Sequence, residues 1–185
     1  MRNPTRTAST LVILVMTAAL SLSCAGATGH PSNAVTPSIA AADEQYIRRI
    51  LSEQAEAWNR GDAVEFSRHF AADGISTNLR GQSFVGYDAF LRQHQFLFGS
   101  LFRNSKLQQD IDVLRFPEPG LAIVEAVTAV SGLGQMPPGV APDAKGRLRT
   151  RLLEVMTRQG GEWKIVAYHN IDIKPGVPTP EPRDD

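Results

Sequence analysis

The apolar residues of this chain change their spacing near its middle, and that change limits the folds it can form. Between residues 43 and 102, apolar side chains recur every three or four positions, as on one face of a helix. Between residues 107 and 173 they alternate or run continuously, in four segments separated by turn residues, as in strands. Helices followed by sequential strands predict an α+β fold with an antiparallel sheet.

Three helices are expected in the first half. The first covers residues 43–60 and ends at Gly61. Asp62 begins the second, with Glu65 three positions later, as in a capping box. The third covers residues 87–102. The apolar faces of the first and third helices are formed by Ile47, Ile50, Leu51, Ala55, Trp58, Phe90, Leu91, Leu97, Phe98 and Leu101.

The strands are expected in two groups. A short strand at residues 75–79 turns at Arg80-Gly81 and returns through Phe84. In the first long strand the alternation changes between Val113 and Leu114, which predicts a bulge there. The four long strands cover residues 107–116, 121–130, 147–158 and 163–173.

Composition sets the class of protein. Hydrophobic residues make up 42% of the chain, enough for a core in one domain. Nineteen basic residues balance nineteen acidic ones, and no basic stripe is evident, which argues against a nucleic-acid partner. The only cysteine, Cys24, precedes the domain, so no disulfide, thiolate nucleophile or cysteine metal site is expected within it.

Residues 1–24 have the layout of a secretory signal peptide. Arg2 and Arg6 form a positive start, and Leu11–Leu22 is an apolar run too short to span a membrane comfortably. The alternative is a short transmembrane anchor, which the length and the flanking residues disfavour. The sequence therefore predicts export.

Two processing sites compete after the apolar run. Ser21–Cys24 resembles a bacterial lipobox, although Ser21 stands where an aliphatic residue is usual. Ala25-Gly26-Ala27 fits ordinary signal cleavage. The placement of Cys24 favours its lipidation, which would make the protein a cell-envelope lipoprotein attached to the membrane through that lipid alone. Cleavage after Ala27 would give a secreted or periplasmic protein.

The rest of the chain divides by composition. Residues 25–42 are small and polar and are expected to form a flexible tether. Residues 43–173 form the predicted domain. Residues 174–185 contain four prolines and are expected to be disordered.

Four short strings carry a resemblance to a known family. They are AWNRGD at 57–62, FAADG at 70–74, the Gly81–Gly86 turn, and WKIVAYHN at 163–170. In this order and spacing they resemble the SnoaL-like subgroup of the NTF2-like superfamily, of the SgcJ/EcaC type. The resemblance implies a cone of three N-terminal helices packed on a strongly bent antiparallel sheet, with a cavity inside and pairing into a homodimer.

The resemblance does not choose a function, because this superfamily contains isomerases, cyclases, dehydratases, hydrolases and proteins that only bind. An oxidoreductase label is common in the subgroup, but no nicotinamide or flavin motif is present. No cofactor and no metal site is therefore expected, since the histidines lack metal-ligand spacing. Cofactor-independent isomerase, cyclase or hydrolase chemistry is the enzymatic expectation, and whether the protein is an enzyme stays open.

Two histidines are the candidate catalytic residues. His169 shares the alternation of Trp163, Ile165 and Ala167, which predicts that it faces the apolar interior of the cone. His94 lies on the apolar face of the third helix. Either ring could transfer a proton or hydrogen-bond a ligand, and either could instead be a core histidine satisfied by one backbone partner.

Three further polar residues are candidate ligand contacts. Glu125 interrupts an apolar strand face, either as a cavity acid or as the ion-pair partner of Arg149 or Arg151. Comparison with ketosteroid isomerase places the position of its general base at Asn78, where an amide cannot take the proton. Asn170 has the opposite orientation to His169 and could serve the cavity or a dimer interface.

Four aromatic residues, Trp58, Phe70, Phe90 and Phe98, are the candidate apolar lining, with plain core packing expected for at least half of them. The favoured hypothesis is a cavity that binds a small, largely apolar molecule. The alternative is a non-catalytic accessory module that pairs through the outer face of its last strand, at Val166 and Tyr168.

Overall fold

The computed structural model describes residues 39–183, so the predicted signal peptide, Cys24 and most of the tether lie outside the described residues. Its three helices are α1 (Ile39–Arg60), α2 (Ala63–Ser67) and α3 (Tyr87–Gly99). Helix α1 begins before the expected start at residue 43, and α3 ends before residue 102. Within residues 39–183, no helix is both long enough and apolar enough to cross a membrane.

Six strands form one sheet in the order β2-β1-β6-β5-β4-β3. Every neighbouring pair is antiparallel except β1 and β6, which run parallel, so the predicted antiparallel sheet contains one parallel pair. The strands are β1 (Phe70–Thr77), β2 (Ser83–Val85), β3 (Lys106–Glu118), β4 (Leu121–Ser131), β5 (Leu148–Gln159) and β6 (Glu162–Asp172).

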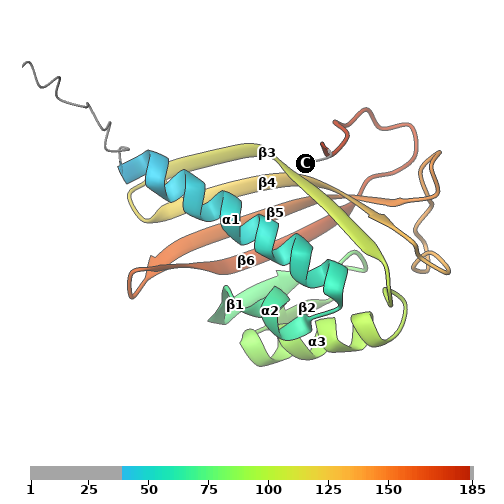
Figure 1. Ribbon diagram of the computed structural model, residues 1–185, viewed down its shortest axis with the longest axis horizontal. Helices are drawn as coiled ribbons and strands as arrows, with labels where there is room; N and C mark the ends of the chain where they lie inside the picture. Colours follow the sequence, from blue (N-terminus) through green and yellow to red (C-terminus); the bar gives the residue numbers. More distant parts are fainter. Residues whose placement is uncertain (1–38, 184–185) are drawn as a thin grey trace, which may run out of the picture. The chain divides into compact units, whose positions relative to one another are not determined.

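Helix α1 lies across one face of the bent sheet, and α2 and α3 lie beside its β1–β2 end (Figure 1). The face that α1 covers is the inner face of the sheet, and the core side chains fill the space between this face and α1. Trp163 of β6 is fully buried there, and its indole N–H donates to Asp43 of α1 over 3.2 Å. Asp62 caps α2 by accepting from the backbone N–H of Val64 and Glu65, as the sequence predicted.

Three irregularities interrupt the ladders. In β3 the register shifts between Ile111 and Val113, close to the predicted bulge. In β6 the partners of Val155 and Met156 are Ala167 and Ile165, so Val166 is an extra residue. In β1 the register against β6 shifts between Phe70 and Ile75. A Cβ at Gly74 in this segment would lie 2.8 Å from the Phe70 ring, so only glycine fits without rearrangement.

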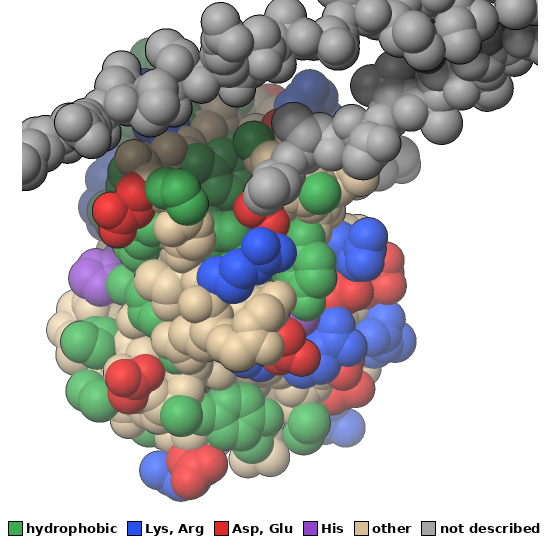
Figure 2. Space-filling view, turned by 90° about the vertical axis from the view of Figure 1, so that its left-hand side faces the viewer, with side chains coloured by type: hydrophobic (Ala, Val, Ile, Leu, Met, Phe, Trp, Pro, Cys, Tyr) green, Lys and Arg blue, Asp and Glu red, His purple; other side chains and the backbone are tan. Residues whose placement is uncertain are grey.

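The C-terminal segment makes defined contacts, although the sequence predicts disorder for it. Glu181 pairs with Arg149 over 2.6 Å and with Arg147 over 2.7 Å. Arg183 pairs with Asp110 of β3 over 2.6 Å. Opposite charges on the sheet thus hold Glu181 and Arg183 in place, although the composition of this segment is typical of a solvated tail. On the face shown in Figure 2, basic and acidic side chains lie side by side, as expected for a chain of zero formal charge.

One carboxyl group lies inside the core. Glu154 of β5 is completely buried, and its Oε1 accepts a 3.1 Å hydrogen bond from the side-chain amide of Gln54 on α1. Its Oε2 and the Oε1 of Gln54 have no partner within the described residues. Burial raises the pKa of Glu154 to about 7, against the smaller opposing effect of the Gln54 hydrogen bond.

This burial makes the stability of the fold depend on pH. Between the ordinary pKa of 4.5 and about 7, folded Glu154 keeps a proton that the unfolded chain has released. The contribution of Glu154 to the free energy of unfolding should therefore fall as pH rises through this range. Glu154→Gln removes this pH-dependent contribution. In urea unfolding, the free energy of unfolding of the variant minus that of the wild type should therefore rise by on the order of 2–3 kcal/mol between about pH 5 and about pH 8. A constant difference between the two proteins would mean that Glu154 is hydrated.

Candidate functional site

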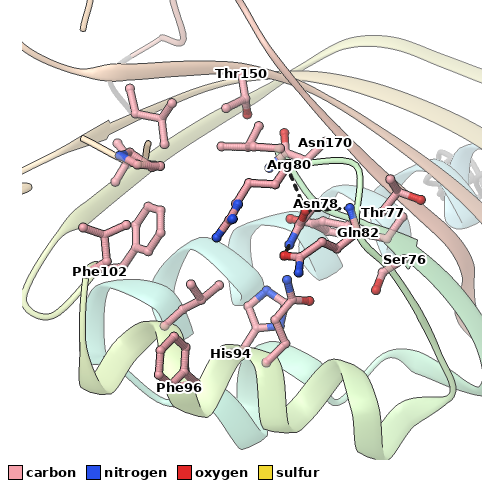
Figure 3. A pocket seen from close by; sticks show the side chains of 18 of the residues that line it. Ser76, Thr77, Asn78, Arg80, Gln82, His94, Phe96, Phe102, Thr150 and Asn170 are labelled. Atoms are coloured by element: carbon pink, nitrogen blue, oxygen red, sulfur yellow. Dashed lines mark hydrogen bonds between the residues drawn. The ribbon is translucent and has the colours of Figure 1, made fainter. Parts of the chain in front are cut away.

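A cavity of about 590 Å³ lies between α3, the β1–β2 turn and the inner faces of β3 to β6 (Figure 3). Helix α1 contributes Trp58, and the loop between β4 and β5 contributes Pro137 and Pro138. A cavity of this size lies within the range that holds small organic ligands.

The cavity has one apolar and one polar wall. The apolar wall comes from the end of α3, the turn after it and the inner faces of three strands. It consists of Leu97, Leu101, Phe102, Leu107, Val130 and Leu148. The polar wall comes from β1, its turn, β5 and β6. It includes Ser76, Thr77, Asn78, Gln82, Thr150 and Asn170, and it continues onto β3 and β4 through Gln109 and Thr128. Such a division suits a ligand with an apolar body and one polar end.

The prediction for His169 is wrong. Its side chain is exposed and does not line the cavity, because Val166 reverses the alternation of β6. Trp163 and Ile165 face the interior before the extra residue, and Tyr168 and Asn170 face it afterwards. Residue alternation read from Trp163 therefore gives the wrong face for every residue after Val166.

Tyr168 takes the place that the sequence assigned to His169. It is 8% exposed and lines the cavity beside His94, with the two ring centroids 6.4 Å apart. Burial, and to a smaller extent the charge of the nearby Glu154, raises the pKa of the Tyr168 hydroxyl above its ordinary value of 10. The phenol therefore stays protonated at neutral pH and can donate a hydrogen bond to a ligand.

His94 lies where the sequence placed it. It is 5% exposed, lines the cavity and packs against the rings of Phe66 and Phe90. Its Nδ1 lies 2.9 Å from the carbonyl oxygen of Phe90, and a carbonyl only accepts, so Nδ1 carries the proton. Burial lowers the pKa of His94 to about 4, although the Phe90 hydrogen bond raises it slightly. At neutral pH the ring is uncharged, with its lone pair on Nε2.

Two polar atoms of the polar wall are buried without a partner among the described residues. They are the hydroxyl oxygen of Ser76 and the side-chain oxygen of Asn170. Buried polar atoms are nearly always hydrogen-bonded, so each is a group that a ligand or water could satisfy after a side-chain rotation. Asn170 therefore belongs to the cavity, which decides between the two placements that the sequence left open.

Asn78 lines the cavity but also holds the β1–β2 turn. Its side-chain oxygen accepts from the backbone N–H of Arg80 and of Gln82, over 2.9 and 3.1 Å. Its amide nitrogen donates to the side-chain oxygen of Gln82 over 3.1 Å. With both ends engaged, Asn78 fixes the backbone of the turn that presents Arg80.

Most of the other predicted site residues lie outside the cavity. Of the four candidate aromatic residues, only Trp58 lines the cavity, and its N–H donates to the Ser105 hydroxyl over 3.0 Å. Phe70 and Phe90 stack on each other with ring centroids 4.0 Å apart, and Phe98 packs on Trp58, so these three are core residues. Glu125 lies outside the cavity and pairs with Arg151 over 2.5 Å, which is the ion-pair alternative.

Sequence reasoning missed Tyr168, Ser76, Arg80 and the buried Glu154. Glu154 could have been found, because it shares the alternation of Leu152 and Met156 on a strand whose inner face is apolar. Tyr168 could not, since nothing in the sequence marks Val166 as an extra residue. Among residues 39–183, no cluster of three or more His, Cys, Asp or Glu side chains could hold a metal ion.

No family model and no curated protein matches this sequence. Solved structures do match its fold. A domain of unknown function with a cystatin-like fold from Nostoc punctiforme aligns with a TM-score of 0.61 and 25% identity, over 70% of this chain and 76% of that one. An NTF-2 like protein of unknown function from Shewanella oneidensis aligns with a TM-score of 0.58 and 18% identity, over 70% and 99%.

The chain has the NTF2-like fold.

A third similar structure, from Novosphingobium aromaticivorans, is named "Putative Scytalone Dehydratase". It aligns with a TM-score of 0.59 and 14% identity, over 75% of this chain and 96% of that one. At this identity the likeness shows the NTF2-like fold alone. The SgcJ/EcaC subgroup stays a prediction from the sequence strings.

The state of His94 can be measured directly. In the folded protein its ring resonances, followed by NMR, should report a neutral Nδ1–H ring down to about pH 5 and titrate near a pKa of about 4. In the urea-unfolded chain the same ring should titrate near the ordinary value of 6.5. A folded-state pKa near 6.5 would show that His94 is hydrated and not a buried part of the cavity wall.

Proposed function

We propose that this protein binds a small, largely apolar molecule inside its NTF2-like cavity. The cavity itself carries the proposal, because about 590 Å³ of space is bounded by side chains that leave it unfilled. Packed protein interiors hold few voids larger than a water molecule, so a space of this size is typical of a binding site. The apolar wall would hold the body of the ligand, and the polar wall would orient it.

Binding is better supported than turnover. The lowered pKa of His94 makes its ring a weak base, and the raised pKa of Tyr168 keeps its hydroxyl protonated. His169, the other candidate base, faces away from the cavity. A His94–Tyr168 pair can donate and accept hydrogen bonds at neutral pH, which suits recognition of a hydroxyl or carbonyl group.

The proposal includes the cellular location that the sequence predicts. The signal peptide and the lipidation of Cys24 would place the cavity in the cell envelope, attached to the membrane by a lipid. The ligand would then be a molecule of the envelope or of the surroundings of the cell.

The cavity can be tested with decanol, a neutral apolar probe, by calorimetric titration of the full chain. Leu101 is a half-buried residue of the apolar wall, so Leu101→Trp should occupy part of the cavity and weaken decanol binding. Asn170→Ala should weaken binding about threefold to tenfold, because it removes a hydrogen-bond partner.

His169→Ala is the matched control, since it alters the adjacent residue of the same strand on the opposite face. This variant should bind decanol as the wild type does. Equal affinity of the wild type and the Leu101→Trp variant would contradict the proposed site. Loss of affinity in His169→Ala together with full affinity in Asn170→Ala would mean that His169, and not Asn170, faces the cavity.

Pairing of two copies is a second candidate function, supported by apolar residues on the outer sheet face. Ile75, Leu153 and Ile171 are 46%, 37% and 63% exposed, and strand register places all three on that face. This surface replaces the predicted seam at Val166 and Tyr168, because Tyr168 faces the interior. An exposed apolar face of this kind is typical of a subunit interface.

We expect light scattering to report a dimer for the wild type and a monomer for Ile171→Glu. The matched control is Val64→Glu on α2, where an equally exposed valine lies away from the sheet face. This variant should remain dimeric. A monomeric wild type at micromolar concentration would exclude the accessory-module hypothesis in this form.

A further inference from the structure

The charges around the cavity are of one sign. Its described lining includes two arginines, Arg80 and Arg92, and no aspartate or glutamate. His94, the other basic residue of the lining, is uncharged at neutral pH because burial lowers its pKa to about 4. The lining therefore carries two positive charges on an otherwise polar and apolar surface.

Arg80 is presented to the cavity by the β1–β2 turn. The Asn78 side chain accepts from its backbone N–H over 2.9 Å, which fixes the turn at this residue. Figure 3 shows the Arg80 side chain extending into the cavity, with its guanidinium directed away from the turn. The ordered β1–β2 hairpin thus fixes the backbone from which the Arg80 side chain extends.

The guanidinium of Arg80 has no hydrogen-bond or ion-pair partner among residues 39–183. Unlike Arg92 and Arg103, most other arginines of the described chain are paired with acids. These include Arg48, Arg68, Arg147, Arg149, Arg151 and Arg158. Arg80 is an exposed residue, so water can solvate its guanidinium, but a carboxylate satisfies the planar donors of this group two at a time. An anion bound in the cavity would supply what the chain does not.

We infer that the ligand of this cavity is an amphipathic carboxylate, with its acid group on Arg80 and its apolar body against Leu97, Leu101 and Leu148. This inference rests on the proposed function and names the class of ligand. Arg92 adds a second positive charge at the same cavity and attracts the anion without a defined contact.

Decanoate and decanol form the decisive probe pair, because they share one apolar chain and differ in charge. Both are titrated calorimetrically into the full-length protein at neutral pH, below the concentration at which decanoate forms micelles. Decanoate should bind roughly tenfold to a hundredfold more tightly than decanol. This preference should shrink as salt is added, because screening weakens the ion pair.

Arg80→Met keeps an unbranched side chain and removes its charge, so it should remove the preference for decanoate over decanol. Arg80→Lys should retain part of the preference. Arg103→Met is the control, since Arg103 is also exposed and unpaired within the described residues but does not line the cavity. This variant should behave as the wild type does.

The outcomes separate the two proposals. Equal affinity of the wild type for both probes would overturn the carboxylate inference and leave the apolar cavity intact. A preference for decanoate that survives in Arg80→Met would also overturn it, because the acid would then bind elsewhere. Failure of both probes to bind would count against the proposed function itself.

Discussion

The extra residue Val166 in β6 determines which side chains form the interior of this molecule. Trp163 and Ile165 are completely buried in the core, and Tyr168 is 8% exposed at the cavity. A regular strand would place Trp163 and Tyr168 on opposite faces, because successive side chains alternate. The bulge lets both be buried on one face, and a bulge also bends the strand that contains it.

The stability contributions of two buried ionisable groups near the cavity change with pH in opposite directions. Burial raises the pKa of Glu154 to about 7, so its contribution to folding is lost as pH rises. Burial lowers the pKa of His94 to about 4, so its contribution is lost as pH falls below its ordinary value of 6.5. Between about pH 4.5 and about 6.5 the two effects offset each other, and both groups are uncharged in the folded state.

The cavity itself costs stability. Its walls leave about 590 Å³ unfilled, and Ser76 and Asn170 each contain a buried atom without a partner among the described residues. A sequence selected for stability alone would fill this space or replace these groups with apolar ones. Their presence is the kind of local cost that proteins retain at functional sites.

Much of the fold follows from the sequence, because the helices and long strands have clear apolar periods. The cap at Asp62 and the position of His94 on an apolar helix face were also readable. Orientation after a bulge was not, which is why His169 was placed inside and Tyr168 outside. Arg80 carries no periodic signal at all, since its direction depends on how Asn78 holds a turn. Single-residue irregularities, and not the secondary structure, therefore limited the prediction of the site.

Native mass spectrometry of the protein purified from its own host tests the central claim most directly. A cavity that binds a small amphipathic molecule predicts a retained mass, released under denaturing conditions and identified as an organic acid. Protein that emerges empty, and that stays empty after incubation with a small-molecule extract of the same host, would contradict the account.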